Sequence, residues 1–126
     1  MDSNLEDKYS IDTEIKYNPL ERINIPEIIS KCSKKWQNIS LCQVNESVIR
    51  LGVIEGEFHW HKHDEEDEFF YVLEGKLLID LEDQTIELNP HDAFLVPKKV
   101  LHKTRAPVRT AILMFEGSNV KPTGDI

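Results

Sequence analysis

The sequence predicts an all-β domain with antiparallel strands and one short helix near its N-terminus. From about residue 39 onward the hydrophobic pattern has a period of two, in short β-prone runs separated by turn signals such as the stretch NPHD. The connections between these runs are too short for crossover helices, so neighbouring strands must be antiparallel. About nine short strands of this kind close most economically as a barrel or a double-sheet roll.

The chain of 126 residues is long enough for one compact domain with a real core and too short for two. We divide it into an N-terminal arm and helix that pack on the barrel (1–38), the barrel domain (39–116) and a C-terminal tail (117–126). The first twenty or so residues are polar and have no steady period. We therefore expect an arm that packs late or frays and carries no chemistry.

The helix is predicted over residues 24–36, which read NIPEIISKCSKKW. Pro26 suits the first helical position. The apolar side chains that recur at helical spacing in this stretch are Ile28, Ile29, Cys32 and Trp36. This apolar stripe is expected to cover one side or end of the barrel, with Lys31, Lys34 and Lys35 facing outward.

The strands are expected in regular order along the rest of the chain. Each run is short, has β-prone residues and is bounded by a turn signal. The predicted strands are residues 39–44, 48–54, 58–63, 68–73, 76–81, 85–88, 93–97, 102–106 and 109–115. Gly75 is expected to end one of them at a tight turn.

The formal net charge of −8 argues against a nucleic-acid partner, because a phosphate backbone is bound by an excess of Lys and Arg. Small polar molecules or cations fit better as ligands. No apolar run approaches the length of a membrane span and no secretory signal follows Met1, so we expect a soluble, cytoplasmic protein without membrane contact. Cys32 and Cys42 are too few, and too unlike a C-x-x-C pair, for a disulfide scaffold or a zinc knuckle.

Three histidines occupy alternate positions in the predicted strand FHWHKH. Strand geometry places His59, His61 and His63 on one face, with the intervening Trp and Lys on the other. An acidic turn over residues 64–67 then returns the chain, and Glu68 starts the next strand beside His61 and His63. The four acidic residues of the turn are interpreted as solvated.

A further histidine, His102, follows a bend marked by Pro97 and enters another predicted strand. Neutral imidazole nitrogens with one carboxylate suit one divalent transition metal (Fe, Mn, Zn, Ni or Cu) better than Ca²⁺ or Mg²⁺. The ligand types do not select among these metals. Four protein ligands in an octahedral shell would leave two positions open, which is typical of a catalytic site.

This arrangement resembles the cupin superfamily, whose first motif reads roughly G-x5-H-x-H-x3-4-E-x6-G and whose second reads roughly G-x5-P-x-G-x2-H-x3-N. The residues that match are Gly56, His61, His63, Glu68, Gly75, Pro97 and His102. The resemblance covers residues 39–116, and the runs DEFFYVLEGKLLIDLED, FLVPKKVLHK and KPTGD look like short bacterial-type cupins of mostly unassigned activity. It implies a small single-domain jelly-roll β-barrel of the cupin 2 type, with His61, His63, Glu68 and His102 as metal ligands.

The sequence departs from the cupin motifs at four points. Only four residues separate Gly56 from His61, and Ala106 replaces the terminal Asn of the second motif. His91 and Lys99 stand where that motif has glycines. We therefore expect these two turns to use backbone conformations other than those that glycine permits.

Several residues have two readings. His59 is the candidate catalytic residue, as a general acid or base, but it could also support the ligands or lie at the rim. Phe70 could line the cavity, although ordinary core is favoured. Arg50 could anchor an anionic group inside the barrel, but a solvent-facing position is favoured. Trp36 and Trp60 are expected to face away from the ligands.

The favoured function is a metal-dependent enzyme that acts on a small polar organic molecule, by isomerase, epimerase, lyase or dioxygenase chemistry. The alternative is a non-catalytic barrel that binds a small ligand or a metal. A purely structural role is disfavoured, because three histidines and a carboxylate inside a barrel are costly without a metal. Open sheet edges and an apolar helix favour a homodimer.

Overall fold

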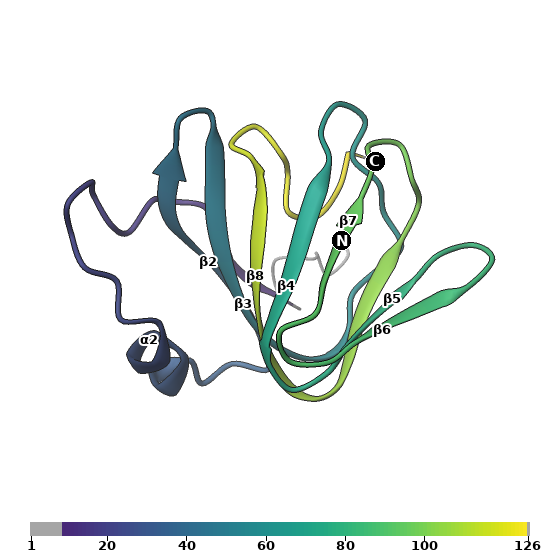
Figure 1. The fold of residues 1–126 in the computed structure, drawn as a ribbon, viewed down its shortest axis with the longest axis horizontal. Helices are drawn as coiled ribbons and strands as arrows, with labels where there is room; N and C mark the ends of the chain where they lie inside the picture. The colour runs from purple at the N-terminus through teal and green to yellow at the C-terminus, as the bar shows by residue number, and fades with distance from the viewer. Residues whose placement is uncertain (1–8, 126) are drawn as a thin grey trace, which may run out of the picture.

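The computed structural model describes residues 9–125 and consists mostly of β-strands, with one short helix, α2 (Ile25–Lys31) (Figure 1). The strands are β1 (Ser10–Asp12), β2 (Trp36–Val44), β3 (Ser47–Glu57), β4 (Glu68–Glu74), β5 (Leu77–Asp80), β6 (Thr85–Leu88), β7 (Ala93–Val96) and β8 (Lys103–Gly117). Among the residues that the structure describes, no helix is long and apolar enough to cross a membrane.

The strands form one sheet in the order β1-β2-β3-β8-β4-β7, while β5 joins it through β8 and carries β6 on its other side. Backbone pairing does not link the two ends of this order, so the described strands do not form a closed hydrogen-bonded barrel. All strand pairs are antiparallel except one, because β1 runs parallel to β2. The prediction of a purely antiparallel sheet is therefore wrong at this edge, where residues 13–35, with α2 among them, provide a crossover.

Strand β8 is the centre of the sheet. Its first residues pair with β5, and its longer second part pairs with β3 on one side and β4 on the other. The sequence predicts two strands here, but the chain continues through Pro107 as one strand. The register with β3 shifts between Ile54 and Gly56, so the exposed Pro107 lies at an irregularity where a proline costs no ladder hydrogen bond.

The helix is shorter than its predicted span. The Asn24 side chain accepts a hydrogen bond from the Glu27 backbone and caps the start, and Cys32 adopts an extended conformation that ends the helix. Trp36 was assigned to the apolar stripe of the helix, and this is wrong. Trp36 is buried at the start of β2, stacked on Phe58 with ring centroids 5.2 Å apart, because the inner face of the sheet buries an indole more completely than a surface helix does.

Two apolar clusters lie on opposite faces of the strands. The inner cluster contains Tyr9, Trp36, Phe58 and Phe70. The outer cluster contains Leu41, Leu51, Val53 and Cys32, and Ile28 and Ile29 of α2 pack against it. The helix therefore covers one face of the sheet, as its apolar stripe predicts. Part of the predicted arm belongs to the fold through Tyr9 and β1, and residues 1–8 lie outside the described residues.

Residues 58–63, predicted as a strand, form no strand. Within this segment His61 alone makes a β-bridge, to His102, and its other residues belong to no strand. Gly56, with φ +108°, and the register shift beside it end β3 one residue later at Glu57. Side chains still alternate at the centre of the segment, since His61 and His63 are buried while Trp60 is 44% exposed.

The two turns without glycine have the backbone conformation that glycine favours. His91 has φ +75° and Lys99 has φ +71°. The expectation that these turns use other conformations is therefore wrong. The turn at Lys99 is fixed by hydrogen bonds on both sides, from the Val100 N–H to the Pro97 carbonyl (3.3 Å) and from the Lys99 N–H to the His63 carbonyl (2.6 Å). The histidine segment thus holds Lys99 in a strained conformation.

Replacing Lys99 with Gly should stabilise the protein by a few tenths to about 1 kcal/mol. The relief of left-handed strain, about 1–2 kcal/mol, exceeds the entropy that glycine adds to the unfolded chain. The measurement is the free energy of unfolding in urea. Lys98→Gly is the control, because the positive φ belongs to Lys99 alone in this pair. Equal destabilisation by both changes would contradict the strain.

Candidate metal centre

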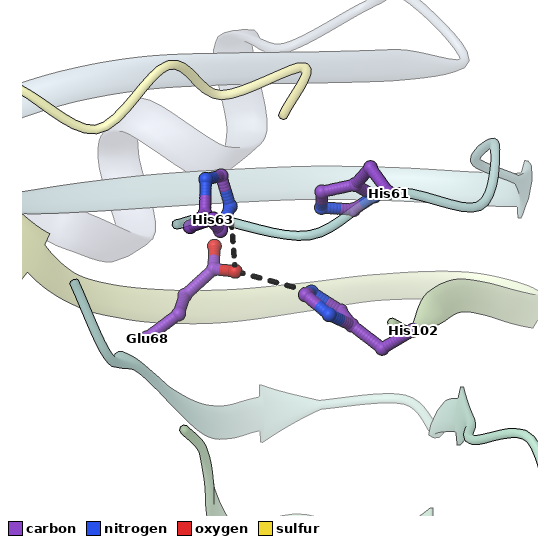
Figure 2. A group of neighbouring side chains, drawn as sticks. All are labelled: His61, His63, Glu68 and His102. Atoms are coloured by element: carbon purple, nitrogen blue, oxygen red, sulfur yellow. Dashed lines mark ion pairs between the residues drawn. The ribbon is translucent and has the colours of Figure 1, made fainter. Parts of the chain in front are cut away.

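Four buried side chains meet at one end of the inner face. One ligand atom from each of His61, His63, Glu68 and His102 lies within 4.8 Å of the others. Figure 2 shows the Glu68 carboxylate between His63 and His102, and the Nε2 atoms of both rings are 3.3 Å from its Oε1 atom. The structure therefore brings together the four residues predicted as ligands.

Backbone pairing sets the positions of the ligands. His61 and His102 exchange two backbone hydrogen bonds of 2.9 Å each, which places their rings 4.3 Å apart. Glu68 is the first residue of β4, and its side chain points inward with those of Phe70 and Val72, which share its face of the strand. The His63 carbonyl is held by the Lys99 N–H. Three separate stretches of sequence thus converge on one point.

Ring orientation leaves ligand nitrogens free to face the cluster. The Nδ1 atom of His61 is 3.0 Å from the His59 carbonyl, and Nδ1 of His102 is 2.9 Å from the Val100 carbonyl. A ring nitrogen beside a carbonyl must carry a proton, so in the neutral form of each of these rings Nε2 holds the lone pair. Within the described residues, His63 Nε2, His102 Nε2 and Glu68 Oε1 are buried and have no hydrogen-bond partner. A cation among them would satisfy all three, and the donor set fits a transition metal.

The ionisation states also suit a cation. Burial, followed by the nearby His102, lowers the pKa of His61 to about 4, so its ring is neutral at pH 7. Burial alone would raise the pKa of Glu68, but the side chains of His102 and His63 outweigh it and hold that pKa well below its usual range. The cluster therefore presents a neutral His61 imidazole and an ionised Glu68 carboxylate, which are the protonation states that metal binding requires.

An ion pair beside the cluster was not foreseen from the sequence. Arg50 is buried and its guanidinium pairs with the buried carboxylate of Glu116, so the preference for a solvent-facing Arg50 is wrong. Its Nε atom also donates to the Ser40 hydroxyl (3.1 Å), and an Nη atom donates to the Val120 carbonyl (3.3 Å). The alternation of side chains along the strands could have predicted that both residues point inward. Arg50 shares the inner face with Gly52, and Glu116 shares it with Met114.

Glu116 is the buried acidic neighbour of Glu68. The two residues are register partners on β8 and β4. Burial, reinforced by the Glu68 carboxylate, raises the pKa of Glu116 well above its usual range, although Arg50 opposes this. At pH 7 Glu68 is therefore ionised and able to bind a cation, while Glu116 takes up a proton more readily than an ordinary carboxyl group.

A small cavity extends from the cluster into the inner face of the sheet, with about 30 Å³ of space for water-sized molecules. Its polar lining residues are Asn38, His61, Glu68, Thr104 and Glu116, and its apolar walls are Trp36, Ile54, Phe58, Phe70, Ile112 and Met114, with Gly52 and Pro122 completing the lining. Phe70 is thus both core and cavity wall. The expectation that Trp36 faces away from the ligands is wrong, because it shares this cavity with His61.

The C-terminal segment, yellow in Figure 1, packs against the ligand segment. The Asp125 N–H donates to the Lys62 carbonyl (3.0 Å), and the Asp64 N–H donates to the Asp125 carboxylate (2.6 Å). Gly124 has φ +95°, and a Cβ atom there would lie 2.5 Å from the His61 Cβ atom. The tail therefore covers the outer side of His61, and Pro122 reaches the cavity.

His59 does not belong to the four-residue cluster. Its Nε2 atom lies 2.6 Å from the Thr123 carbonyl, and its ring centroid is 5.2 Å from that of His61. The structure therefore shows His59 bonded to the tail and adjacent to His61. A catalytic role for His59 stays a prediction.

The fold and the site define a small β-sheet protein with a buried group of three histidines and a glutamate. The cupin domain family model matches residues 48–115, which is more than half of the chain. The chain is 44% identical over 94 residues to the uncharacterized protein YdbB of Bacillus subtilis (strain 168), covering 74% of this chain and 83% of that protein. This protein belongs to the cupin family.

Solved structures agree with this assignment. A cupin-2 domain containing protein from Shewanella frigidimarina NCIMB 400 is 35% identical and superposes with a TM-score of 0.72, covering 75% of this chain and 93% of that one. A cupin superfamily protein from Desulfitobacterium hafniense DCB-2 is 22% identical with a TM-score of 0.68, covering 82% of this chain and 97% of that one. The second likeness concerns the fold alone.

Acidification should destabilise the metal-free protein through His61. The pKa of His61 falls from 6.5 to about 4 on folding, so between these values the unfolded chain binds more protons and stability falls as the pH drops. The loss below pH 4 should reach about 3 kcal/mol. The measurement is the free energy of unfolding between pH 7 and pH 4.5, compared with His61→Gln. Parallel curves for the two proteins would contradict this assignment.

Removing residues 122–126 should expose His61. The truncation takes away Gly124 and Asp125 and keeps the contact between Val120 and Arg50, so the fold should persist. Modification of His61 by diethyl pyrocarbonate, followed by peptide mass spectrometry, should become at least several-fold faster. His91, exposed on the surface, is the internal control and should react at an unchanged rate. An unchanged rate at His61 would show that the tail does not cover it.

Proposed function

We propose that this cupin binds one divalent transition metal through His61, His63, Glu68 and His102 and uses it to act on a small organic molecule. The observation that carries the proposal is the set of buried, unpartnered ligand atoms that converge within 4.8 Å. Leaving such atoms unsatisfied costs about 1–3 kcal/mol each, and a bound cation removes this cost. The same pairing pattern supports the inference that the strands curve into the jelly-roll barrel of the family.

A metal held by these residues would supply Lewis-acid catalysis, or redox chemistry if the metal is iron. The chain itself contributes position and exclusion of water. The carbonyls of His59 and Val100 fix the tautomers of His61 and His102. The tail and the aromatic walls limit the access of water to the cavity. Glu116, with its raised pKa, is the residue placed to hold a proton beside Glu68.

A non-catalytic binding module is the second candidate function. It is favoured by the narrow, largely apolar cavity, which would hold a small ligand without any further catalytic group. His59 is the candidate catalytic residue from the sequence, but its bond to Thr123 supports a role in holding the tail. Small-molecule ligands, a cytoplasmic location and a homodimer stay predictions.

Purified protein should carry about one equivalent of transition metal, as measured by elemental mass spectrometry on protein made without a chelating tag. The double change of His61 and His63 to Ala should reduce this to background, because two of four ligands are lost. His91→Ala is the matched control, since His91 is exposed and bonded to Tyr71. Metal retained after loss of both ligands would refute the site.

Catalysis separates the two candidate functions. The metal-loaded protein should convert a small substrate, and Glu116→Gln should lower kcat while the metal content stays near one equivalent. Saturable binding without turnover across substrate classes would instead favour the binding module.

A further inference from the structure

The walls of the cavity contain acidic and neutral groups but no cation. Its polar lining consists of a histidine, two carboxyl groups, a threonine and the amide of Asn38, and the remaining lining is apolar. Among the residues that the structure describes, neither Lys nor Arg lines it. An anionic group on a ligand would therefore meet no counter-charge from the protein away from the metal ligands, and burying an unpaired charge is strongly unfavourable.

The nearest buried cation is already used. Arg50 pairs with Glu116 and also donates to Ser40 and to the Val120 carbonyl. These contacts direct the guanidinium toward β2 and the tail, and Arg50 does not line the cavity. The charge of Arg50 is thus neutralised by contacts within the fold and is not available to a ligand.

Asn38 is the uncharged polar group of the cavity wall whose amide oxygen lacks a partner, and among the described residues the carboxyl atoms Glu68 Oε1 and Glu116 Oε1 in the same wall lack one as well. The Asn38 side chain is buried with 9% exposed, and its Oδ1 atom has no hydrogen-bond partner among the described residues. Asn38 lies on β2 opposite Gly52 of β3. A Cβ atom at Gly52 would come within 3.1 Å of Ile112 and 3.2 Å of Met114, so the bare glycine keeps this part of the wall open. A ligand that donates a hydrogen bond would satisfy the amide oxygen.

We infer that the ligand of this cavity is a small uncharged molecule whose distal end is apolar or carries a hydroxyl group for Asn38. The inference rests on the proposed function, since the other end of the ligand would reach the metal beside His61 and Glu68. The aromatic and aliphatic walls bury the carbon skeleton of the ligand, and the Asn38 amide oxygen accepts a hydrogen bond from one donor group of the ligand. Molecules with a distal phosphate or carboxylate are excluded by the acidic lining.

Three hydroxamates with the same chain of two methylene groups test this inference, because they share one metal-binding head and differ only in the group at the distal end. Butanohydroxamate ends in a methyl group, 3-hydroxypropanohydroxamate ends in a hydroxyl, and the monohydroxamate of succinate ends in a carboxylate. Each is titrated into the Co(II)-loaded protein, and the visible spectrum of the cobalt reports binding. The methyl and hydroxyl probes should bind at least tenfold more tightly than the carboxylate probe.

Asn38→Leu tests the amide contact with little change in side-chain volume. The variant should weaken binding of the hydroxyl probe about tenfold relative to the methyl probe, which is the size of one lost hydrogen bond. Its cobalt content should stay at one equivalent, because Asn38 is not a metal ligand. An unchanged ratio of the two affinities would remove Asn38 from ligand recognition.

The outcomes separate this inference from the proposed function. If cobalt binds and the carboxylate probe is the tightest of the three, or none of the probes binds, the ligand class is wrong and the metal site stands. If no cobalt binds to the wild-type protein, the proposed function fails and this inference fails with it. The comparison of probes on the wild-type protein needs no variant, so a folding defect cannot obscure it.

Discussion

Two buried carboxyl groups, on Glu68 and Glu116, face each other across β4 and β8, and the rest of the site is arranged around their charge. Like charges this close and this buried cannot both ionise without cationic partners. Arg50 pairs with Glu116, while the ion-pair partners of Glu68 among the described residues are His63 and His102 and include no Lys or Arg. A cation bound among Glu68 and the three histidines would supply the positive charge that Glu68 lacks.

The Arg50–Glu116 ion pair is also connected to the C-terminal segment that covers the site. Arg50 also binds the Val120 carbonyl, and so fixes the start of the segment that continues to Pro122, Gly124 and Asp125. That segment covers His61 and is bonded again at Lys62 and Asp64. The charge of Arg50 thus joins β3 to β2, to the end of β8 and to the tail, and so links the buried Glu116 carboxyl to the segment that covers His61.

The sequence predicted those features that depend on local period or spacing. Alternation identified the β-rich fold, and the spacing of His61, His63, Glu68 and His102 identified a cluster that the structure assembles. Features decided by packing were missed. The position of Trp36 fits a helical period as well as it fits a strand. Only its packing in the inner apolar cluster shows that it belongs to a strand. Arg50 looks like a surface residue until Glu116, 66 positions away, is placed beside it.

The loss of the predicted strand at residues 58–63 has a structural consequence for the site. A strand in a ladder is held along its length by one neighbouring strand, but here the backbone bonds of Phe58, His61, Lys62 and His63 go to β8, to His102, to the tail and to the turn at Lys99. Elements outside the strand ladders open at lower free energy than the core strands. A cation bound by His61 and His63 would hold this segment to β4 through side chains, so metal binding and the ordering of residues 58–67 should be one linked equilibrium.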